Sequence, residues 1–255
     1  MSVTFDSDLT ACAALVERGD PERFAAAMAA PVAARAVLFP IYAFNVEVAR
    51  APWVTSEPLI AQMRLQWWAD ALEEIASGGP VRRHEVVTPL ARVLTPAAVV
   101  SLSMLVDARR LDVERAPFAS EEALLRYLSE TAGSLAEAAA QSLGAPSQAM
   151  EGLARWGQAA GLARYLRAVP ALKALGRKPL PPGADVIRLV QICLDEIPSW
   201  RAMACRLGPG RAAALELWQA QPVLRQAVWN PARVDDGRLG LSPFSAKWRL
   251  LLAAL

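Results

Sequence analysis

The sequence has few of the side chains that build most metal and redox sites. Its 255 residues include three cysteines and one histidine. The cysteines, Cys12, Cys193 and Cys205, are far apart and odd in number, which indicates reduced thiols in the cytosol and not a disulfide framework. The sequence has no CxxC or HxxxH pair, which argues against a zinc site. We expect His84, in a loop between Gly-Pro and Thr-Pro, to face solvent.

An excess of charge of one sign is also missing. Lys and Arg total 27 and Asp and Glu total 25, which gives a formal net charge of +2. No block of like charges stands out as a tail. The balance therefore favours neither a nucleic acid nor an acidic molecule as a partner.

Neither a membrane-spanning segment nor a secretory signal is expected. Mean hydropathy is high at +0.24, but the longest apolar stretch, 86–106, is interrupted by Pro89, Arg92 and Pro96, and a spanning helix needs about 20 mostly apolar residues. Residues 1–20 carry acids early, without a basic region before their apolar residues. The apolarity indicates an Ala/Leu-rich core or a surface that meets lipid, and composition favours the core.

Helical periodicity dominates the chain. It is rich in Ala, Leu, Glu and Arg and has no convincing strand, so we expect an all-α protein with one domain over residues 1–255. Asp20-Pro21 predicts one helix start. Capping and breaking signals predict further helices over about 33–50, 56–78, 95–112, 120–144, 147–169, 185–205, 209–219 and 242–255. We expect residues 221–240 to form an irregular, mobile strap, and residues 248–252 to dock on the core or touch a membrane or partner.

Four segments form a recognisable set. They are Arg35 with 38–45, then 63–73, then Tyr127 with 132–134, and last 157–159 with Leu162, Arg167 and 176–181. In this order and spacing they resemble the squalene/phytoene synthase family over roughly residues 20–182. The resemblance implies an isoprenoid-synthase-type helical bundle around a central cavity.

Enzymes of that family join two prenyl diphosphates head to head, with magnesium ions held between two acidic motifs on facing helices. Carboxylates four residues apart share a helix face, and two such faces hold hard cations that bridge diphosphate oxygens. Here the motif positions fall on Ala49, Arg50, Trp53, Arg164, Arg167, Ala168 and Leu172. Only Arg167 fits the family pattern. The resemblance therefore implies neither catalytic residues nor a metal site.

The replacements themselves resemble one branch of the family. Residues 43–49 and 166–170 are similar to the branch that includes the mitochondrial assembly factor for respiratory complex I and its bacterial relatives, which is regarded as lacking prenyl transfer. We expect a non-catalytic binding or assembly protein without a cofactor. Its expected partners are respiratory complex subunits or a prenyl or phospholipid ligand, and its expected location is the cytoplasm, with peripheral contact to the inner membrane.

Two other functions stay open. One is an active head-to-head prenyltransferase that binds Mg²⁺ through divergent ligands, for which Glu47, Glu57 and Asp70 are the acids near the first motif. The other is a lipid carrier that keeps the hollow of the family and uses its arginines to hold a headgroup.

The degenerate motifs and their neighbours define the expected ligand pocket. Arg50, Arg164 and Arg167 are the hypothetical metal-free anion site, because arginine binds phosphate bidentately and keeps its charge. Arg50 could instead form an ordinary ion pair with Glu47 or Glu57. Aromatic residues in the set line a prenyl cavity or belong to the core. The expected pocket residues are Tyr42, Asn45, Glu47, Arg50, Arg64, Gln66, Trp67, Tyr127, Arg164 and Arg167.

Overall fold

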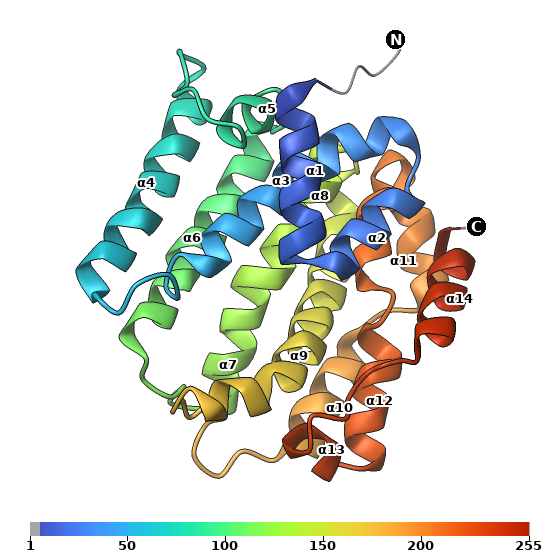
Figure 1. The fold of residues 1–255 in the computed structure, drawn as a ribbon. Coiled ribbons are helices and arrows are strands. Elements are labelled where there is room, and N and C mark those ends of the chain that lie inside the picture. Colours follow the sequence, from blue (N-terminus) through green and yellow to red (C-terminus); the bar gives the residue numbers. More distant parts are fainter. Residues whose placement is uncertain (1–5, 255) are drawn as a thin grey trace.

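A computed structural model describes residues 6–254, and no strand occurs among them (Figure 1). The all-α prediction is confirmed. The first α-helices are α1 (Ser7–Gly19), α2 (Pro21–Ala29), α3 (Val32–Arg50), α4 (Pro58–Ser77), α5 (Val87–Ala91), α6 (Pro96–Glu114), α7 (Glu121–Leu128) and α8 (Ser134–Ser142). They are followed by α9 (Met150–Ala174), α10 (Val186–Glu196), α11 (Trp200–Arg206), α12 (Ala220–Trp229), α13 (Ala232–Asp235) and α14 (Pro243–Ala254). A π-helical turn, η1 (Ser129–Gly133), and two 3₁₀ helices, η2 (Ser147–Ala149) and η3 (Gly208–Leu217), complete the fold.

Helix boundaries in the first half follow the local signals in the sequence. The Asp20 side chain accepts a hydrogen bond from the Arg23 backbone N–H at the start of α2. Pro58 opens α4, and Gly78 ends it with a φ of 67°, a conformation that glycine adopts without steric cost. Thr95 caps α6 in the same way as Asp20 caps α2. These boundary predictions are confirmed because each depends on a few neighbouring residues.

The C-terminal third corrects three predictions. Residues 221–240 are not an irregular strap, because α12 and α13 occupy most of them and Val223, Leu224 and Ala227 are buried. The single helix expected over 185–205 is broken at Pro198, which has no N–H to continue α10, and Ser199 caps α11. The segment expected as an α-helix over 209–219 is the 3₁₀ helix η3.

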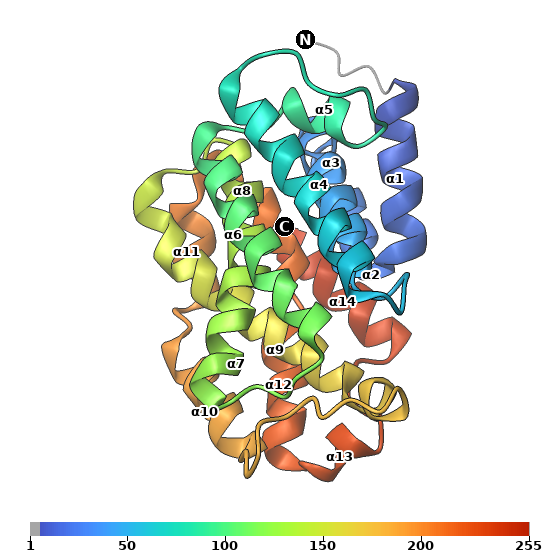
Figure 2. The ribbon, with the colours of Figure 1, turned by 90° about the vertical axis from the view of Figure 1, so that its left-hand side faces the viewer.

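Helix α9 runs through the middle of the molecule in both views (Figure 1 and Figure 2). Its side chains enter both clusters of buried apolar residues: Leu153 and Trp156 lie in one, and Leu162 and Leu166 lie in the other. We predicted an end near residue 169, but α9 continues through Pro170 to its end at Ala174. The two halves of the core are therefore joined by one continuous helix.

Helix α9 crosses the π-helical turn at close range. The helix expected over 120–144 contains η1 at this crossing, between α7 and α8. A Cβ atom placed on Gly157 would lie 2.8 Å from the Ala132 oxygen and 2.8 Å from the Gly133 Cα. One on Gly133 would lie 3.2 Å from the Ala154 oxygen. Gly133 and Gly157 are therefore required, because the backbones of η1 and α9 approach too closely to leave room for a Cβ atom.

The apolar helix α3 is the one helix among residues 6–254 that is long and apolar enough to cross a membrane by length and composition. Ten of its residues are buried, among them Leu38, Phe39 and Phe44. Its apolarity is that of a core helix, which meets the same criterion.

The three thiols differ in their surroundings. Cys12 and Cys193 are buried and Cys205 is exposed, and none is in a disulfide. Burial raises the pKa of Cys12 and of Cys193 to about 12. The two buried thiols are therefore protonated and unreactive at neutral pH.

Replacing Gly157 should test the close crossing. We expect Gly157→Ala to lower the free energy of unfolding by about 1–3 kcal/mol, because the added methyl group meets backbone atoms that cannot move aside easily. Gly79→Ala is the control, since its Cβ would meet only the Ser77 hydroxyl at 3.5 Å. Urea unfolding followed by circular dichroism measures both. Equal midpoints for Gly157→Ala and wild type would contradict the assignment.

Candidate functional site

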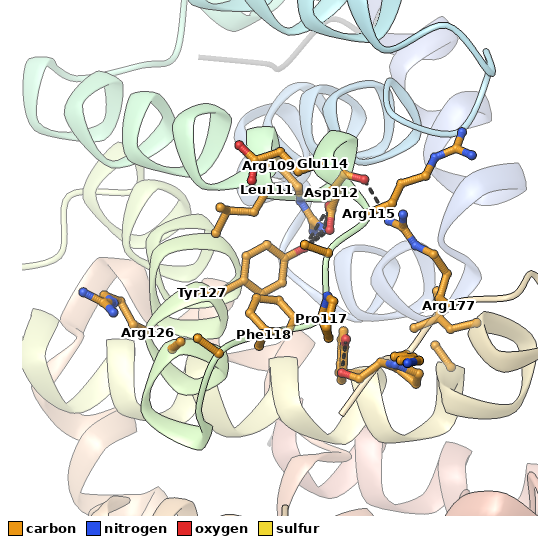
Figure 3. A pocket seen from close by; sticks show the side chains of 18 of the residues that line it. Arg109, Leu111, Asp112, Glu114, Arg115, Pro117, Phe118, Arg126, Tyr127 and Arg177 are labelled. Atoms are coloured by element: carbon orange, nitrogen blue, oxygen red, sulfur yellow. Dashed lines mark hydrogen bonds and ion pairs between the residues drawn. The ribbon is translucent and has the colours of Figure 1, made fainter. Parts of the chain in front are cut away.

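A cavity of about 620 Å³ lies between the C-terminal end of α6, the helices α7 and α9, and the loops 115–119 and 177–179 (Figure 3). Three motif positions line it: Trp53, Ala168 and Leu172. The arginines at motif positions line other cavities, so this one coincides with only part of the degenerate motifs. We call it the basic pocket because five cations line it against three carboxylates. The cations are Arg109, Arg115, Arg126, Arg177 and Lys178, and the carboxylates are Asp112, Glu114 and Glu130.

One wall of the basic pocket is a fixed hydrogen-bonded group. Arg109 donates to the Tyr127 hydroxyl at 2.6 Å and to Asp112 Oδ2 at 3.1 Å, and the Tyr127 hydroxyl donates to Asp112 Oδ2 at 2.9 Å (Figure 3). Burial raises the pKa of Tyr127 well above its usual value. The phenol therefore stays protonated, and Asp112 is occupied by partners of its own.

Arg177 also lines the basic pocket. One of its terminal nitrogens donates to the Asp112 backbone oxygen at 2.7 Å, and its guanidinium carbon lies 4.8 Å from the centre of the Trp53 ring. Its other terminal nitrogen is buried and has no hydrogen-bond partner, and the same is true of Arg109 Nε. Buried donors without an acceptor are uncommon and costly. The excess of cations over carboxylates in the lining favours an anion, such as a phosphate group, as an occupant of the pocket.

The residues predicted for the ligand pocket do not meet in one place. Tyr42 and Asn45 are core residues, 1% and 6% exposed. Gln66 donates to Asp70 at 2.7 Å and accepts from Arg110 at 2.9 Å, which ties α4 to α6.

Of the predicted set, Tyr127 lines the basic pocket. Four others line a second cavity, a groove of about 450 Å³ between α3 and α4: Glu47, Arg50, Arg64 and Trp67.

The three arginines expected to form one anion site lie at two places. Arg50 donates to Glu47 at 3.1 Å, which is the ordinary ion pair that we considered as the alternative. Arg164 and Arg167 line a cavity of only about 10 Å³, where Glu216 and Glu22 are their partners. Carboxylates already neutralise these cations, so the three side chains do not converge on a common ligand.

His84 is also placed differently from our expectation. It is half-buried, and its ring packs edge-on against Trp67 and Trp68 with centroids 5.2 and 5.5 Å away. Its Nδ1 accepts a hydrogen bond from the Val86 N–H at 3.1 Å. The loop after α4 is therefore fastened to the α3–α4 groove and does not project into solvent.

Sequence reasoning missed a buried ion cluster made of Asp20, Arg23, Arg164 and Glu216. Arg23 and Arg164 both donate to Glu216 Oε2, at 2.5 and 2.9 Å, and the Glu216 side chain is 0% exposed. Arg23 also pairs with Asp20. The cluster joins α2, α9 and η3, which are far apart in the chain, so no local pattern could reveal it.

The electrostatics of this cluster favour the ionised carboxylate of Asp20. Burial by itself would raise the pKa of Asp20, but the positive charges of Arg23 and Arg164 outweigh it and hold that pKa below its usual value. Among residues 6–254, no three His, Cys, Asp or Glu side chains gather in a way that could hold a metal ion.

Solved structures share this fold across nearly the whole chain. A dehydrosqualene synthase crystallised in complex with a ligand aligns with a TM-score of 0.71 and 15% identity, over 96% of this chain and 95% of the other. Squalene synthase HpnC from Alicyclobacillus acidocaldarius aligns with a TM-score of 0.68 and 15% identity, over 92% and 95%. The fold is therefore the isoprenoid-synthase type of helical bundle, as predicted.

The sequence narrows the class further. The squalene/phytoene synthase family model matches residues 16–206, and the chain belongs to that family. It is 32% identical over 170 residues to the Drosophila melanogaster homolog of NADH dehydrogenase (ubiquinone) complex I assembly factor 6, covering 62% of this chain and 50% of that protein. The human assembly factor 6 is 27% identical over 162 residues, covering 62% and 48%. The chain spans about half the length of these curated relatives. The predicted likeness to the assembly-factor branch is confirmed.

Removing the carboxylate of Glu216, at the centre of the buried ion cluster, should make the folded protein less stable. We expect Glu216→Ala to lower the free energy of unfolding by about 3–5 kcal/mol, because it leaves two guanidinium groups without their shared acceptor. Glu151→Ala is the matched control: its side chain is 80% exposed and pairs with Arg155 on the surface, so a loss below about 1 kcal/mol is expected. Urea unfolding at neutral pH distinguishes the two. Similar losses would show that the buried cluster contributes no more than a surface pair.

Asp20 should make stability depend on acid pH. Its folded-state pKa is lowered, so its contribution is complete above the unfolded value of about 4 and is lost as the pH falls through the folded value. Wild type should therefore lose more stability below about pH 4 than Asp20→Asn does. Asp107→Asn, with a side chain 72% exposed, should follow wild type. Urea midpoints across this range test the point, and parallel curves for wild type and Asp20→Asn would refute it.

Proposed function

We propose that this protein is a non-catalytic member of the squalene/phytoene synthase family that acts in the assembly of respiratory complex I. We propose further that its basic pocket holds the phosphate group of a prenyl or phospholipid molecule without turning it over. The observation that carries the proposal is the lining of the pocket: the motif positions that reach it are the apolar residues Trp53, Ala168 and Leu172, and five cations from other positions surround it.

The residues that line the basic pocket are the reason to propose that this protein does not use metal ions for catalysis. The motif positions that reach the pocket are the apolar residues Trp53, Ala168 and Leu172. Magnesium is bound through carboxylates and phosphate oxygens, and an excess of guanidinium groups would repel it. Of the three carboxylates of the pocket, Asp112 already bonds Arg109 and Tyr127, and Glu114 and Glu130 do not gather with it into a group that could hold a metal ion. An active prenyltransferase would need carboxylates that are free to bind metal.

The ligand part rests on two arginines. Arg109 and Arg177 line the same cavity, where their guanidinium groups would hold a phosphate group through charged hydrogen bonds. Phe118, Tyr165 and Leu172 line the same cavity and offer apolar surface to the chain attached to such a headgroup. Prenyl diphosphates and phospholipids share this chemistry.

The assembly part rests on the relatives. Proteins named as complex I assembly factor 6 in human and Drosophila align over 62% of this chain. Deletion of the gene for this chain in its source organism should lower the amount of assembled complex I on native gels, and wild type should restore it. Complex I at wild-type levels in the deletion strain would refute this part of the proposal.

Turnover should be absent. With farnesyl or geranylgeranyl diphosphate and magnesium or manganese, we expect no diphosphate release above a heat-killed control. A phosphate assay with extraction of the products measures this. Formation of a C30 or C40 hydrocarbon would establish the prenyltransferase alternative instead.

Binding should persist without turnover. We expect Arg177→Gln to weaken the binding of farnesyl diphosphate or phosphatidic acid by about tenfold or more, because one charged hydrogen-bond donor is lost. Arg201→Gln, on the exposed surface of α11, is the control and should bind like wild type. Calorimetry with farnesyl diphosphate and, separately, with phosphatidic acid measures the affinity for each and shows which of the two the pocket binds. Equal affinity of both variants for both ligands would remove the basic pocket from the proposal.

A further inference from the structure

The C-terminal helix α14 lies on the outside of the bundle, at the right edge of Figure 1, and it has no buried residue. Its inner side, with Leu250 and Ala253, packs partly against the core. The contacts that hold it are made to α2 and η3. The rest of α14 faces away from the protein.

The outer face of α14 is apolar. Phe244 is 80% exposed, Trp248 53%, Leu251 51% and Leu252 54%. Their spacing of four, three and one residues places them on one side of a helix, opposite Leu250 and Ala253. Four large apolar side chains in one exposed stripe are unusual for a surface that meets only water.

The borders of this face are cationic. Lys247 and Arg249 are exposed on either side of the apolar stripe, and residues 237–255 contain three cations and no acid. Arg249 also faces Arg225 of α12 across a groove of about 390 Å³. One turn beyond Arg225 on α12, Trp229 is 83% exposed.

We propose that α14 lies flat on an anionic lipid surface and inserts Phe244, Trp248, Leu251 and Leu252 among the lipids. An apolar stripe with aromatic residues, bordered by Lys and Arg, is the pattern of a helix at a membrane interface. Anionic headgroups attract the cations Lys247 and Arg249. The long side chains of these two residues reach past the apolar stripe to the level of the headgroups. The absence of any acid in residues 237–255 removes the repulsion that such a surface would otherwise meet.

The first test is flotation of the full chain with vesicles. Wild type should float with a mixture of phosphatidylcholine and phosphatidylglycerol and remain in solution with phosphatidylcholine alone. Salt should weaken the binding, because screening reduces attraction between exposed charges. Failure to float with the anionic mixture at low salt would refute the proposal.

Two variants separate the apolar and charged contributions. Phe244→Ser/Trp248→Ser should lower the vesicle partition coefficient by about tenfold or more. Lys247→Glu/Arg249→Glu should abolish the preference for anionic vesicles. Leu59→Ser/Met63→Ser is the matched apolar control, since those side chains on α4 are 72% and 63% exposed; it should float like wild type. Circular dichroism checks that each variant is folded.

The remaining controls identify other occupants of the face. Arg177→Gln should float like wild type, because this surface is independent of the basic pocket; loss of flotation would assign the lipid contact to that pocket instead. Light scattering of wild type and Phe244→Ser/Trp248→Ser tests self-association. If wild type is a dimer and this variant is a monomer, the apolar face of α14 is an interface between two copies of the chain and not a membrane-binding surface.

Discussion

The carboxylate of Glu216, shared by Arg23 and Arg164, is the interaction on which the rest of the structure depends. It joins three elements that lie far apart in the sequence, and a buried charge of this kind remains stable only while its partners stay in place. The cluster therefore fixes the position of α9. On that helix Tyr165 and Ala168 lie one and four residues after Arg164, and both line the basic pocket, so the shape of the pocket depends on a charge outside it.

The two arginine groups in the molecule have different consequences. In the buried ion cluster, carboxylates neutralise the guanidinium groups and the remaining space is about 10 Å³. In the basic pocket, Arg109 and Arg177 line a cavity of about 620 Å³. A buried, unpaired guanidinium nitrogen occurs in both groups, on Arg164 in the cluster and on Arg109 and Arg177 in the pocket. The two groups therefore differ in the space that they leave for a ligand. This difference, and not the number of arginines, is what distinguishes a structural cluster from a candidate ligand site.

The sequence was sufficient for features that depend on neighbouring residues. Caps such as Asp20 and the stop at Gly78 placed the early helices correctly, and Tyr127, predicted for the ligand pocket, lines the basic pocket. It was insufficient where distant residues meet: Glu216 finds its partners on α2 and α9, and Arg109 and Arg177 converge from two elements. The buried residues Val223, Leu224 and Ala227 did carry a helical spacing, which the nearby Gln, Asn and Pro residues obscured.

The stacking of Trp53 on Arg177 has a consequence for the possible descendants of this protein. An aspartate at position 53 would remove the ring that supports the guanidinium group and would pair with that group before any divalent ion could arrive. Carboxylates at Ala168 or Leu172 would enter the same cationic surroundings. No single substitution recreates a metal site, and several would have to occur together. A change that placed metal-binding carboxylates in this pocket would therefore have to replace its cations as well.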